Sequence, residues 1–446
     1  MRWQGLIGVG LLIVSGITSG QKVRGMGRVM AFGNTTPIDI ELPDVGQDME
    51  VDPVRQLLYV SVPARNEIVV ISLNSLTIVD LLFVGNRPHG IDLSADGRTL
   101  YAALHQATSV AYLDLESGLV SDTIVLGDLL GHSTTWDVVE GQPDRIFVSA
   151  NPSSGGFAYI VQIDRAAGNA LRRVAGQRII RCAPTFAASP DMSSVYVGEC
   201  FSPESLYKLS LSTIEAPIVL EDNHGSVSGT SHLEVSPDGA RIYLRSGQIL
   251  RTSDFTQIGS IGAGPSRLNA EGSLAYVAAT ANRIDLYDTT TRLKVGELAV
   301  PCAPSGFGTG MMLVLPDDRG LVTLSGGRIC GQLFGEVFSL AVGPGSEDFV
   351  TTQVFDAVLR VDPGNQRITS LSATLDGARV PGDKLIAGST QEGETTLRLP
   401  DVRLDRPGDH RFEVELRLAN GAELTAVAEW HSIATRETST GLGTKK

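Results

Sequence analysis

The sequence lacks an excess of positive charge. Its 446 residues include 36 Lys and Arg against 50 Asp and Glu, which gives a formal net charge of −14 at pH 7. Nucleic acids and anionic membranes are bound through basic surfaces, so neither is expected as a partner. The chain is 42% hydrophobic and 19% charged, a globular composition, and its length predicts more than one domain.

Local catalytic motifs are also missing. The sequence contains no G-x-S-x-G, no H-E-x-x-H, no P-loop and no C-x-x-C-H. The glycines of GFGTG (306–310) are followed by strand-like sequence, whereas a phosphate cradle needs a helix N-terminus. These absences favour a binding or scaffold protein over an enzyme. An enzyme stays open as the alternative, because catalytic pairs drawn from distant parts of a chain leave no local motif.

Long hydrophobic runs are absent except at the N-terminus. Arg2 precedes an apolar stretch from Leu6 to Ile17, and the small residues 18–20 follow it. This pattern predicts a signal peptide over residues 1–20 and a protein that is secreted, periplasmic or held at the cell surface. An uncleaved anchor is the alternative, although the stretch is short for a membrane span. Loss of Arg2 would leave the mature chain at −14 − 1 = −15.

Cysteine is scarce. The four cysteines are Cys182, Cys200, Cys302 and Cys330, and no C-x-x-C pair occurs among them. An even number in an exported chain predicts disulfides, with zinc ligation or free buried thiols as alternatives.

A repeated unit occupies the first three quarters of the chain. Residues 87–104, RPHGIDLSADGRTLYAAL, combine an apolar strand, an Asp-Gly turn and a second strand that carries Tyr101. The same order recurs after residues 189–191 and after residues 236–239. Seven second strands of this kind are centred 33 to 49 positions apart, on Tyr59, Tyr101, Phe147, Tyr196, Tyr243, Tyr276 and Val322.

Each unit predicts four short strands. Third strands such as 109–115 and fourth strands such as 77–85 follow the Tyr strand, and no amphipathic helical pattern interrupts them. Seven such units predict an all-β fold, a seven-bladed β-propeller of four-stranded blades over residues 37–337. Residues 38–43, IDIELP, precede the first full blade and are expected to complete the last one, which would cover its open edge.

The repeat also resembles a known family. The sequence pattern is VGxxPxGIxxSxDGxxLYxA…VxxLDLxSG, which residues 84–118 match best and residues 236–300 match more loosely. This pattern resembles that of the YVTN-type β-propeller proteins of secreted bacterial and archaeal type. The resemblance implies the propeller strongly and a function only weakly. Members include surface-layer-associated proteins, and related propellers serve as lactonases or as subunits beside redox enzymes.

The composition changes after residue 338. Alternating segments separated by Pro-Gly and Asn-Gly turns predict a C-terminal Ig-like β-sandwich over residues 345–434. The segment DRPGDHRFEVEL resembles the PGxHxxxV wording of Ig-like modules appended to secreted bacterial proteins. Residues 21–36 are expected to form a linker, and residues 435–446 a disordered tail.

The propeller would gather polar residues at one mouth of its channel. First strands line the channel, and the candidate ligand-binding residues stand at their starts or in adjacent loops: Asp48, His89, His105, Trp136, Arg181, Glu199 and His232. Plain structural roles are the alternative, since His89 fills an ordinary position of the repeat and Trp136 could plug the channel. No cofactor is predicted, and a divalent metal is left open.

The cysteines fit the same face. Cys182 and Cys302 each precede a first strand, whereas Cys200 and Cys330 each follow the second strand of the same blade. Because these strands are antiparallel, we expect the bridges 182–200 and 302–330 on one face. The resulting prediction is an exported, monomeric scaffold that binds a protein or small ligand through this disulfide-braced face. The alternative is an extracytoplasmic lactonase-like hydrolase or an oxidoreductase-associated subunit.

Overall fold

Two compact units make up the chain, residues 36–333 and residues 1–35 with 334–446. The computed structural model describes residues 27–432 apart from gaps at 34, 132, 153–156, 175–179, 182, 201, 223–225, 281, 301, 303–310, 335, 344–353, 363–366, 382–385, 392–393, 404–407 and 420–422. The expected signal peptide and tail lie outside the described residues.

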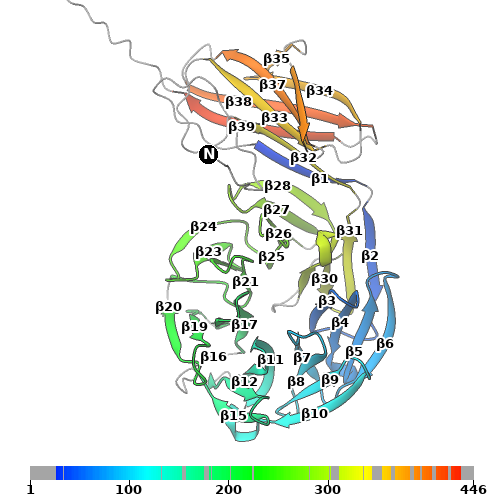
Figure 1. Cartoon of the computed structure of the whole chain (residues 1–446), viewed down its shortest axis with the longest axis vertical. Coiled ribbons are helices and arrows are strands. Elements are labelled where there is room, and N and C mark those ends of the chain that lie inside the picture. Colours follow the sequence, from blue (N-terminus) through cyan, green and yellow to red (C-terminus); the bar gives the residue numbers. More distant parts are fainter. Residues whose placement is uncertain are drawn as a thin grey trace, which may run out of the picture. The chain divides into compact units, whose positions relative to one another are not determined.

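Residues 36–333 form seven four-stranded antiparallel sheets (Figure 1). The first three sheets contain, each from first to fourth strand, β3 (Asp48–Asp52), β4 (Leu57–Val62), β5 (Glu67–Ser72) and β6 (Thr77–Phe83); β7 (Pro88–Leu93), β8 (Thr99–Leu104), β9 (Ser109–Asp114) and β10 (Leu119–Val125); and β11 (Ser133–Gln142), β12 (Arg145–Pro152), β14 (Val161–Asp164) and β15 (Ala170–Arg173). The next three sheets contain, in the same order, β17 (Thr185–Ala188), β18 (Ser194–Gly198), β19 (Leu206–Ser210) and β20 (Ile218–Asp222); β21 (Leu233–Val235), β22 (Arg241–Leu244), β23 (Gln248–Arg251) and β24 (Gln257–Ser260); and β25 (Ser266–Leu268), β26 (Leu274–Thr280), β27 (Arg283–Asp288) and β28 (Lys294–Ala299). A small extra sheet pairs β13 (Phe157–Ala158) with β16 (Ile180–Arg181).

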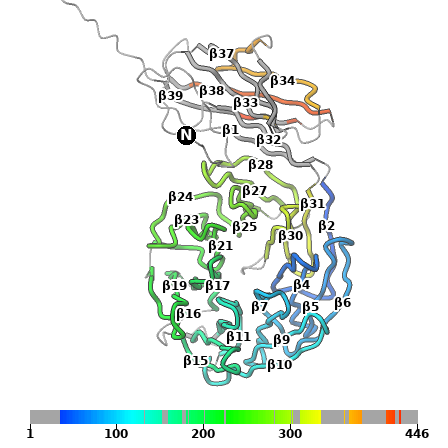
Figure 2. Tube along the Cα trace, viewed as in Figure 1, coloured from blue at the N-terminus to red at the C-terminus, as the bar shows by residue number. Residues whose placement is uncertain are grey.

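The seventh sheet joins the two ends of this unit. It contains β29 (Met312–Val314), β30 (Gly320–Ser325) and β31 (Arg328–Leu333), and its fourth strand is β2 (Thr36–Glu41). Ile38 pairs with Gly331 and Ile40 with Ile329, so the expected closure by the N-terminal strand is confirmed. Figure 2 shows blue β2 beside yellow β31. Pairing of the two ends covers an edge that would otherwise be open.

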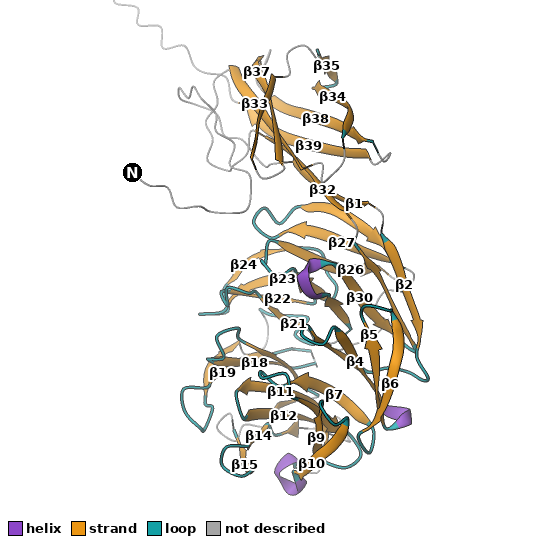
Figure 3. Ribbon diagram, turned by 45° about the vertical axis from the view of Figure 1, so that its right-hand side comes forward, coloured by secondary structure: helices purple, strands orange, loops and turns teal. Residues whose placement is uncertain are grey.

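The sheets are arranged as a closed ring. Each first strand contacts the first strands of both neighbouring sheets, and β29 contacts β3. The first strands therefore line the central axis, while fourth strands such as β6 and β10 lie at the rim (Figure 1). Helical elements in the described part are short 3₁₀ turns: η1 (Pro63–Arg65), η2 (Gly127–Leu130) and η4 (Pro316–Asp318) (Figure 3).

The repeated residues have the positions that the sequence predicts. The seven central residues, from Tyr59 to Val322, all fall in second strands and are buried. Tyr59 packs in a cluster with Ile91 and Leu100 of the following sheet, so these side chains join neighbouring sheets. The turn after β7 is held by Ser94, whose hydroxyl donates to the Asp96 carboxylate over 2.7 Å.

The second unit contains two sheets. One is five-stranded, in the order β1 (Gly27–Gly33), β32 (Glu336–Gly343), β33 (Val354–Asp362), β37 (Glu394–Arg403), β36 (Ile386–Gln391). The other is four-stranded, in the order β35 (Ala378–Val380), β34 (Ile368–Leu375), β38 (Gly408–Leu418), β39 (Glu423–Ser432). Strands β1 and β32 contact β39, so the two sheets pack on each other.

Strand β1 differs from expectation, because residues 21–36 were expected to be a linker. Residues 27–33 instead form an antiparallel pair with β32, from Gly27 opposite Val342 to Gly33 opposite Glu336. The C-terminal unit also begins earlier than expected, with β32 in its first sheet. A pairing across about 300 residues has no local signature, and the strand itself is short.

Candidate functional site

The sheets of the ring share one end, here called the top face, where first strands begin and second strands finish. Because these strands are antiparallel, the two places meet at the same end of each sheet. All seven candidate residues lie at this end: Asp48, His89, His105, Trp136, Arg181, Glu199 and His232. They form separate groups rather than one constellation, and each group is held differently.

Three aromatic rings make the first group, the His–Trp cluster of His89, His105 and Trp136. The ring centroids of His89 and Trp136 are 3.7 Å apart, with planes tilted by 37°. The His105 ring lies 5.5 Å from that of His89 and 5.8 Å from that of Trp136. His89 starts β7, His105 follows β8 and Trp136 lies in β11, so two neighbouring sheets build the cluster. All three side chains are half-buried.

Hydrogen bonds fix the orientation of both imidazoles. His89 Nδ1 lies 3.1 Å from the Trp136 carbonyl oxygen, and His105 Nδ1 lies 2.8 Å from the Thr135 carbonyl oxygen. A carbonyl oxygen only accepts, so Nδ1 carries the hydrogen in each ring, and Nε2 has the lone pair when the ring is neutral. Burial, followed by the neighbouring His105, lowers the pKa of His89 to about 3. His89 is therefore neutral at physiological pH.

Arg181 and Glu199 form the second group. Arg181 Nη2 lies 2.9 Å from Glu199 Oε2, and the Arg181 backbone N–H donates to Oε1 over 3.1 Å. The Tyr207 hydroxyl also donates to Oε1 over 3.1 Å. The Glu199 side chain is only 2% exposed, and its ionic partner is 24% exposed. This pair anchors β16 to the end of β18, and only the arginine reaches the surface.

One predicted disulfide is confirmed near this face. Cys302 and Cys330 are bonded, with Cα atoms 5.7 Å apart and 28 positions of sequence separation. Cys330 lies within the third strand, β31, and the Cys302 carbonyl accepts a hydrogen bond from Thr323 Oγ1 over 2.6 Å. Cys200 is also disulfide-bonded, and its predicted partner Cys182 lies outside the described residues.

Asp48 and His232 are buried links between sheets. The two Asp48 carboxylate oxygens accept the backbone N–H groups of Met49 and of Ile91 in the next sheet, both over 2.9 Å. His232 Nε2 lies 3.0 Å from the Ser266 backbone nitrogen of its next sheet. These groups hold the ring together at positions where a ligand site was predicted.

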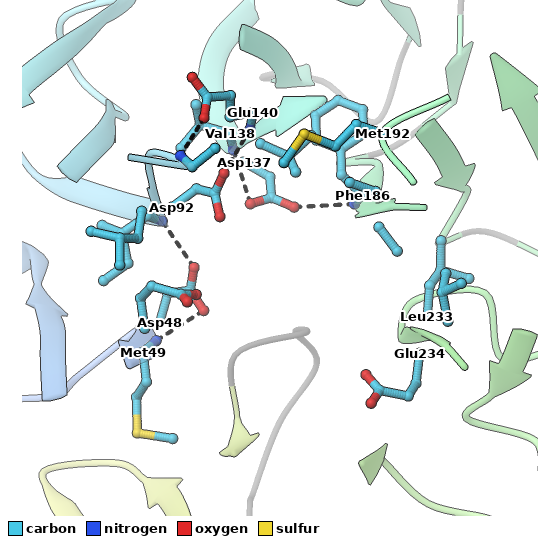
Figure 4. A pocket seen from close by; sticks show the side chains of 18 of the residues that line it. Asp48, Met49, Asp92, Asp137, Val138, Glu140, Phe186, Met192, Leu233 and Glu234 are labelled. Atoms are coloured by element: carbon cyan, nitrogen blue, oxygen red, sulfur yellow. Dashed lines mark hydrogen bonds between the residues drawn. The ribbon is translucent and has the colours of Figure 1, made fainter. Parts of the chain in front are cut away.

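A cavity of about 310 Å³ lies along the axis among the first strands. Figure 4 shows Asp48, Asp92, Asp137 and Glu140 on one side of it and Glu234 on the other. Its lining includes the middle of each contributing strand and the turn residues Ala95 and Met192, which belong to the opposite face. His89 and Trp136 do not line it. The cavity and the His–Trp cluster are therefore two distinct features of the ring.

The cavity is acidic. Six carboxylates and one guanidinium line it: Asp48, Glu50, Asp92, Asp137, Glu140, Glu234 and Arg267. The Arg267 guanidinium lies 2.5 Å from Glu234, an ion pair that neutralises one of the six.

Several of these carboxylates link sheets in a repeated manner. Asp137 accepts from the Phe186 N–H over 3.2 Å, as Asp48 does from Ile91. Asp92 accepts from the Glu140 N–H over 2.6 Å. Each bond runs from a carboxylate of one first strand to the backbone of the next first strand, so the same side chains line the cavity and join the sheets.

Enclosure changes the acidity of these groups. Burial raises the pKa of Asp48 to about 6 and that of Asp137 to about 8. Burial and the neighbouring Asp48 raise the pKa of Glu50 to about 7. The pKa of Asp92 is also well above its usual range, because of burial and the nearby Glu50. Carboxyls of this kind exchange protons near neutral pH and occur frequently at functional sites.

Within the described part of the chain, no group of three or more His, Cys, Asp or Glu side chains is placed to hold a metal ion. No helix among the same residues is long and apolar enough to span a bilayer.

Comparison with solved structures decides the fold. The β-propeller domain of Cps50 (Swd1) from Myceliophteria thermophila aligns over 69% of this chain and all of its own, at 13% identity and a TM-score of 0.50. This chain has a β-propeller fold. Hydrazine synthase from Kuenenia stuttgartiensis aligns over 55% of this chain and 84% of its own, at 16% identity and a TM-score of 0.45. No family model and no curated protein matches the sequence.

Sequence reasoning missed most of the propeller's cavity. It named Asp48 but none of the other charged residues that line the cavity, because no motif marks them: Glu50, Asp92, Asp137, Glu140, Glu234 and Arg267. A usable signal existed: an acidic residue in or beside the predicted first strand of several units, as in GIDL and HLEV. Since first strands surround the axis, such residues must converge there.

Proposed function

We propose that the chain is an exported, monomeric binding or scaffold protein: a seven-bladed YVTN-type propeller with an appended Ig-like module, which binds a protein or small ligand through the top face. The seven sheets in their ring are its blades, and the two packed C-terminal sheets are the Ig-like module. One observation carries the proposal: the fold gathers the His–Trp cluster and the solvent-reaching Arg181 at a single face. Aromatic and arginine side chains are the groups that dominate binding energy at protein interfaces.

The cysteines support export. Cys302, Cys330 and Cys200 are disulfide-bonded, and disulfides persist in oxidising compartments. The apolar N-terminal stretch and the net charge of −14 fit a protein that works outside the cytoplasm and away from nucleic acids.

Site-specific photo-crosslinking in the producing cells tests the binding face. A photoreactive amino acid replaces Thr134 or Arg181 on the top face, and Asp96 or Asp238 at turns of the opposite face serves as the control. We expect discrete crosslinked species from the top-face positions only, and their loss when Trp136→Ala is added. Crosslinks from the opposite face alone would contradict the proposal. N-terminal sequencing of the mature chain tests export, with cleavage expected near Gly20.

The cavity favours a second function, an extracytoplasmic hydrolase or a subunit of an oxidoreductase. Asp137 and Glu50, with pKa values of about 8 and about 7, have the acidity that general acid–base catalysis needs near neutral pH. Turnover of a panel of lactones by the mature chain, abolished in Asp137→Asn and retained in His89→Gln, would establish this function. Turnover that is absent, or unchanged by Asp137→Asn, would remove the hydrolase form of this function.

A further inference from the structure

We infer that His89 and His105 together form a binding site for one transition-metal ion at the top face of the propeller. The inference goes beyond the proposed function, because an ion is bound by the chain alone, with or without a partner on that face. It starts from the spacing of the two rings. Two imidazoles that share an ion at metal–nitrogen distances of about 2 Å place their centroids about 4.5 to 6.3 Å apart, depending on the angle at the ion. The His89 and His105 centroids are 5.5 Å apart.

The hydrogen bonds prepare both rings for this role. His89 donates from Nδ1 to the Trp136 carbonyl, and His105 donates from Nδ1 to the Thr135 carbonyl. A histidine ligand characteristically donates its other ring N–H in this way, which fixes the tautomer and orients the lone pair of Nε2. Both anchoring carbonyls belong to consecutive residues of β11, so one rigid strand holds the two rings in place.

The Nε2 lone pairs have no partner within the part of the chain that the structure describes. Among the described residues, neither the Nε2 atom of His89 nor that of His105 takes part in a hydrogen bond. Ring nitrogens elsewhere in the chain also anchor to the fold: His232 Nε2 contacts the Ser266 backbone, and His410 Nδ1 lies 2.8 Å from Asp376. In each cluster histidine, Nδ1 therefore orients the ring and Nε2 is available to a ligand.

The ligand set selects the ion. Neutral imidazoles suit Cu²⁺, Ni²⁺ and Zn²⁺, whereas Mg²⁺ and Ca²⁺ prefer oxygen ligands. When these transition-metal ions compete for the same site, Cu²⁺ binds most tightly. Two imidazoles leave coordination positions for water or for a group of a bound molecule. No third His, Cys, Asp or Glu joins them within the described residues, so the expected site is open and exchangeable.

Trp136 supplies an internal reporter. Its ring lies 3.7 Å from that of His89, so a Cu²⁺ ion at the site quenches its fluorescence. The test uses the mature chain without a polyhistidine tag, treated with a chelator and carrying Trp430→Phe so that Trp136 dominates the emission. CuCl₂ is titrated while fluorescence and heat are recorded. We expect saturable quenching with one ion per chain.

Substitution identifies the ligands. His89→Gln and His105→Gln should each weaken Cu²⁺ binding at least about tenfold, equivalent to about 1.4 kcal/mol. His431→Gln, on β39 of the other unit, is the matched control and should leave the affinity unchanged. Circular dichroism and the melting temperature show that each variant is folded. Electron paramagnetic resonance of the Cu²⁺ complex should show coupling to two nitrogens, reduced to one in either variant.

The inference is overturned by an absence of saturable quenching, by affinity that neither substitution changes, or by a resonance spectrum of oxygen ligands only. These outcomes are separable from failure of the proposed function. Crosslinking at the top face measures a partner in cells, whereas the titration measures the ion on the isolated chain.

Discussion

Gly90 lies directly against Asp137 of the next sheet: a Cβ atom on Gly90 would stand 2.7 Å from the Asp137 Cα atom and 3.0 Å from the Trp136 carbonyl oxygen. The glycine of the Pro-His-Gly sequence is thus a place where two backbones approach closely. The approach also brings Trp136 to His89, and the two ring centroids are 3.7 Å apart. The His–Trp cluster depends on this contact.

Gly90→Ala should destabilise the propeller by about 1–3 kcal/mol, because the added methyl group meets backbone atoms that cannot turn away. Urea unfolding followed by Trp136 fluorescence measures the change. Gly327→Ala is the control, since the nearest atom to its added Cβ is 3.5 Å away, an ordinary contact. If the two variants were equally stable, the sheet of β7 would be able to move away from β11 and make room for the added methyl group.

Stability of the propeller should fall as the pH rises from about 4 to about 8. Burial raises the pKa values of Asp48 to about 6 and Asp137 to about 8, so the folded state holds protons that the unfolded state has released. The contribution of such a group to the free energy of unfolding is complete below the pKa that it has in the unfolded chain. This contribution is lost as the pH rises to the pKa that the group has in the folded protein. The slope is about 1.4 kcal/mol per pH unit for each carboxyl that stays protonated in the folded state.

Urea midpoints measured from pH 4 to pH 9 test this dependence. Asp137→Asn keeps an oxygen to accept the Phe186 N–H and removes one titrating group, so its pH slope should be smaller. Glu116→Gln also replaces a carboxyl by an amide, but at an exposed position, and should leave the slope as it is. A stability that rises with pH over this range would mean that the backbone hydrogen bonds outweigh the cost of burial.

Much of the propeller can be predicted from sequence because its units are local. The Tyr strands and the Ser-Asp turns each follow from patterns of fewer than about 50 residues, and the closing strand follows from the last unit, which is otherwise incomplete. The structure has all of them in the predicted places. Strand β1 could not be found in this way, because its partner β32 lies at the other end of the chain.

The site was predicted only in part for the same reason. The sequence places His89, His105 and Trp136 at one mouth, since each has a fixed position in its unit. The sequence does not show that the two imidazoles are hydrogen-bonded to the consecutive carbonyls of Thr135 and Trp136. Nor does it show that the Asp48 carboxylate accepts the Ile91 N–H. Such details depend on how neighbouring sheets approach, which no single unit encodes. The cavity is the feature hardest to predict from the sequence, because it exists only after the ring has closed.

Removal of the Cys302–Cys330 bridge in the variant Cys302→Ala/Cys330→Ala should cost about 2–4 kcal/mol, the usual effect of a bridge of this span. The bond closes a loop of 28 positions onto β31, where Cys330 is fully buried. Thermal unfolding with and without dithiothreitol measures it. Any effect of the reductant on the double variant reports the disulfide of Cys200. A double variant as stable as the oxidised protein would show that β-pairing alone secures the last sheet.

Closure of the ring should depend on the buried face of β2 and hardly on its charges. Ile38 is 1% exposed within the core shared by the first and last sheets, whereas Asp39, the next residue, pairs with Arg328 at the surface. Ile38→Ala should therefore cost about 2–5 kcal/mol through lost burial and a cavity. Asp39→Ala should cost less than about 1 kcal/mol, because an exposed ion pair is screened by water. Urea unfolding at low and high salt compares them. If Asp39→Ala proved the more damaging of the two, the ion pair rather than apolar burial would be what holds the ends of the propeller together.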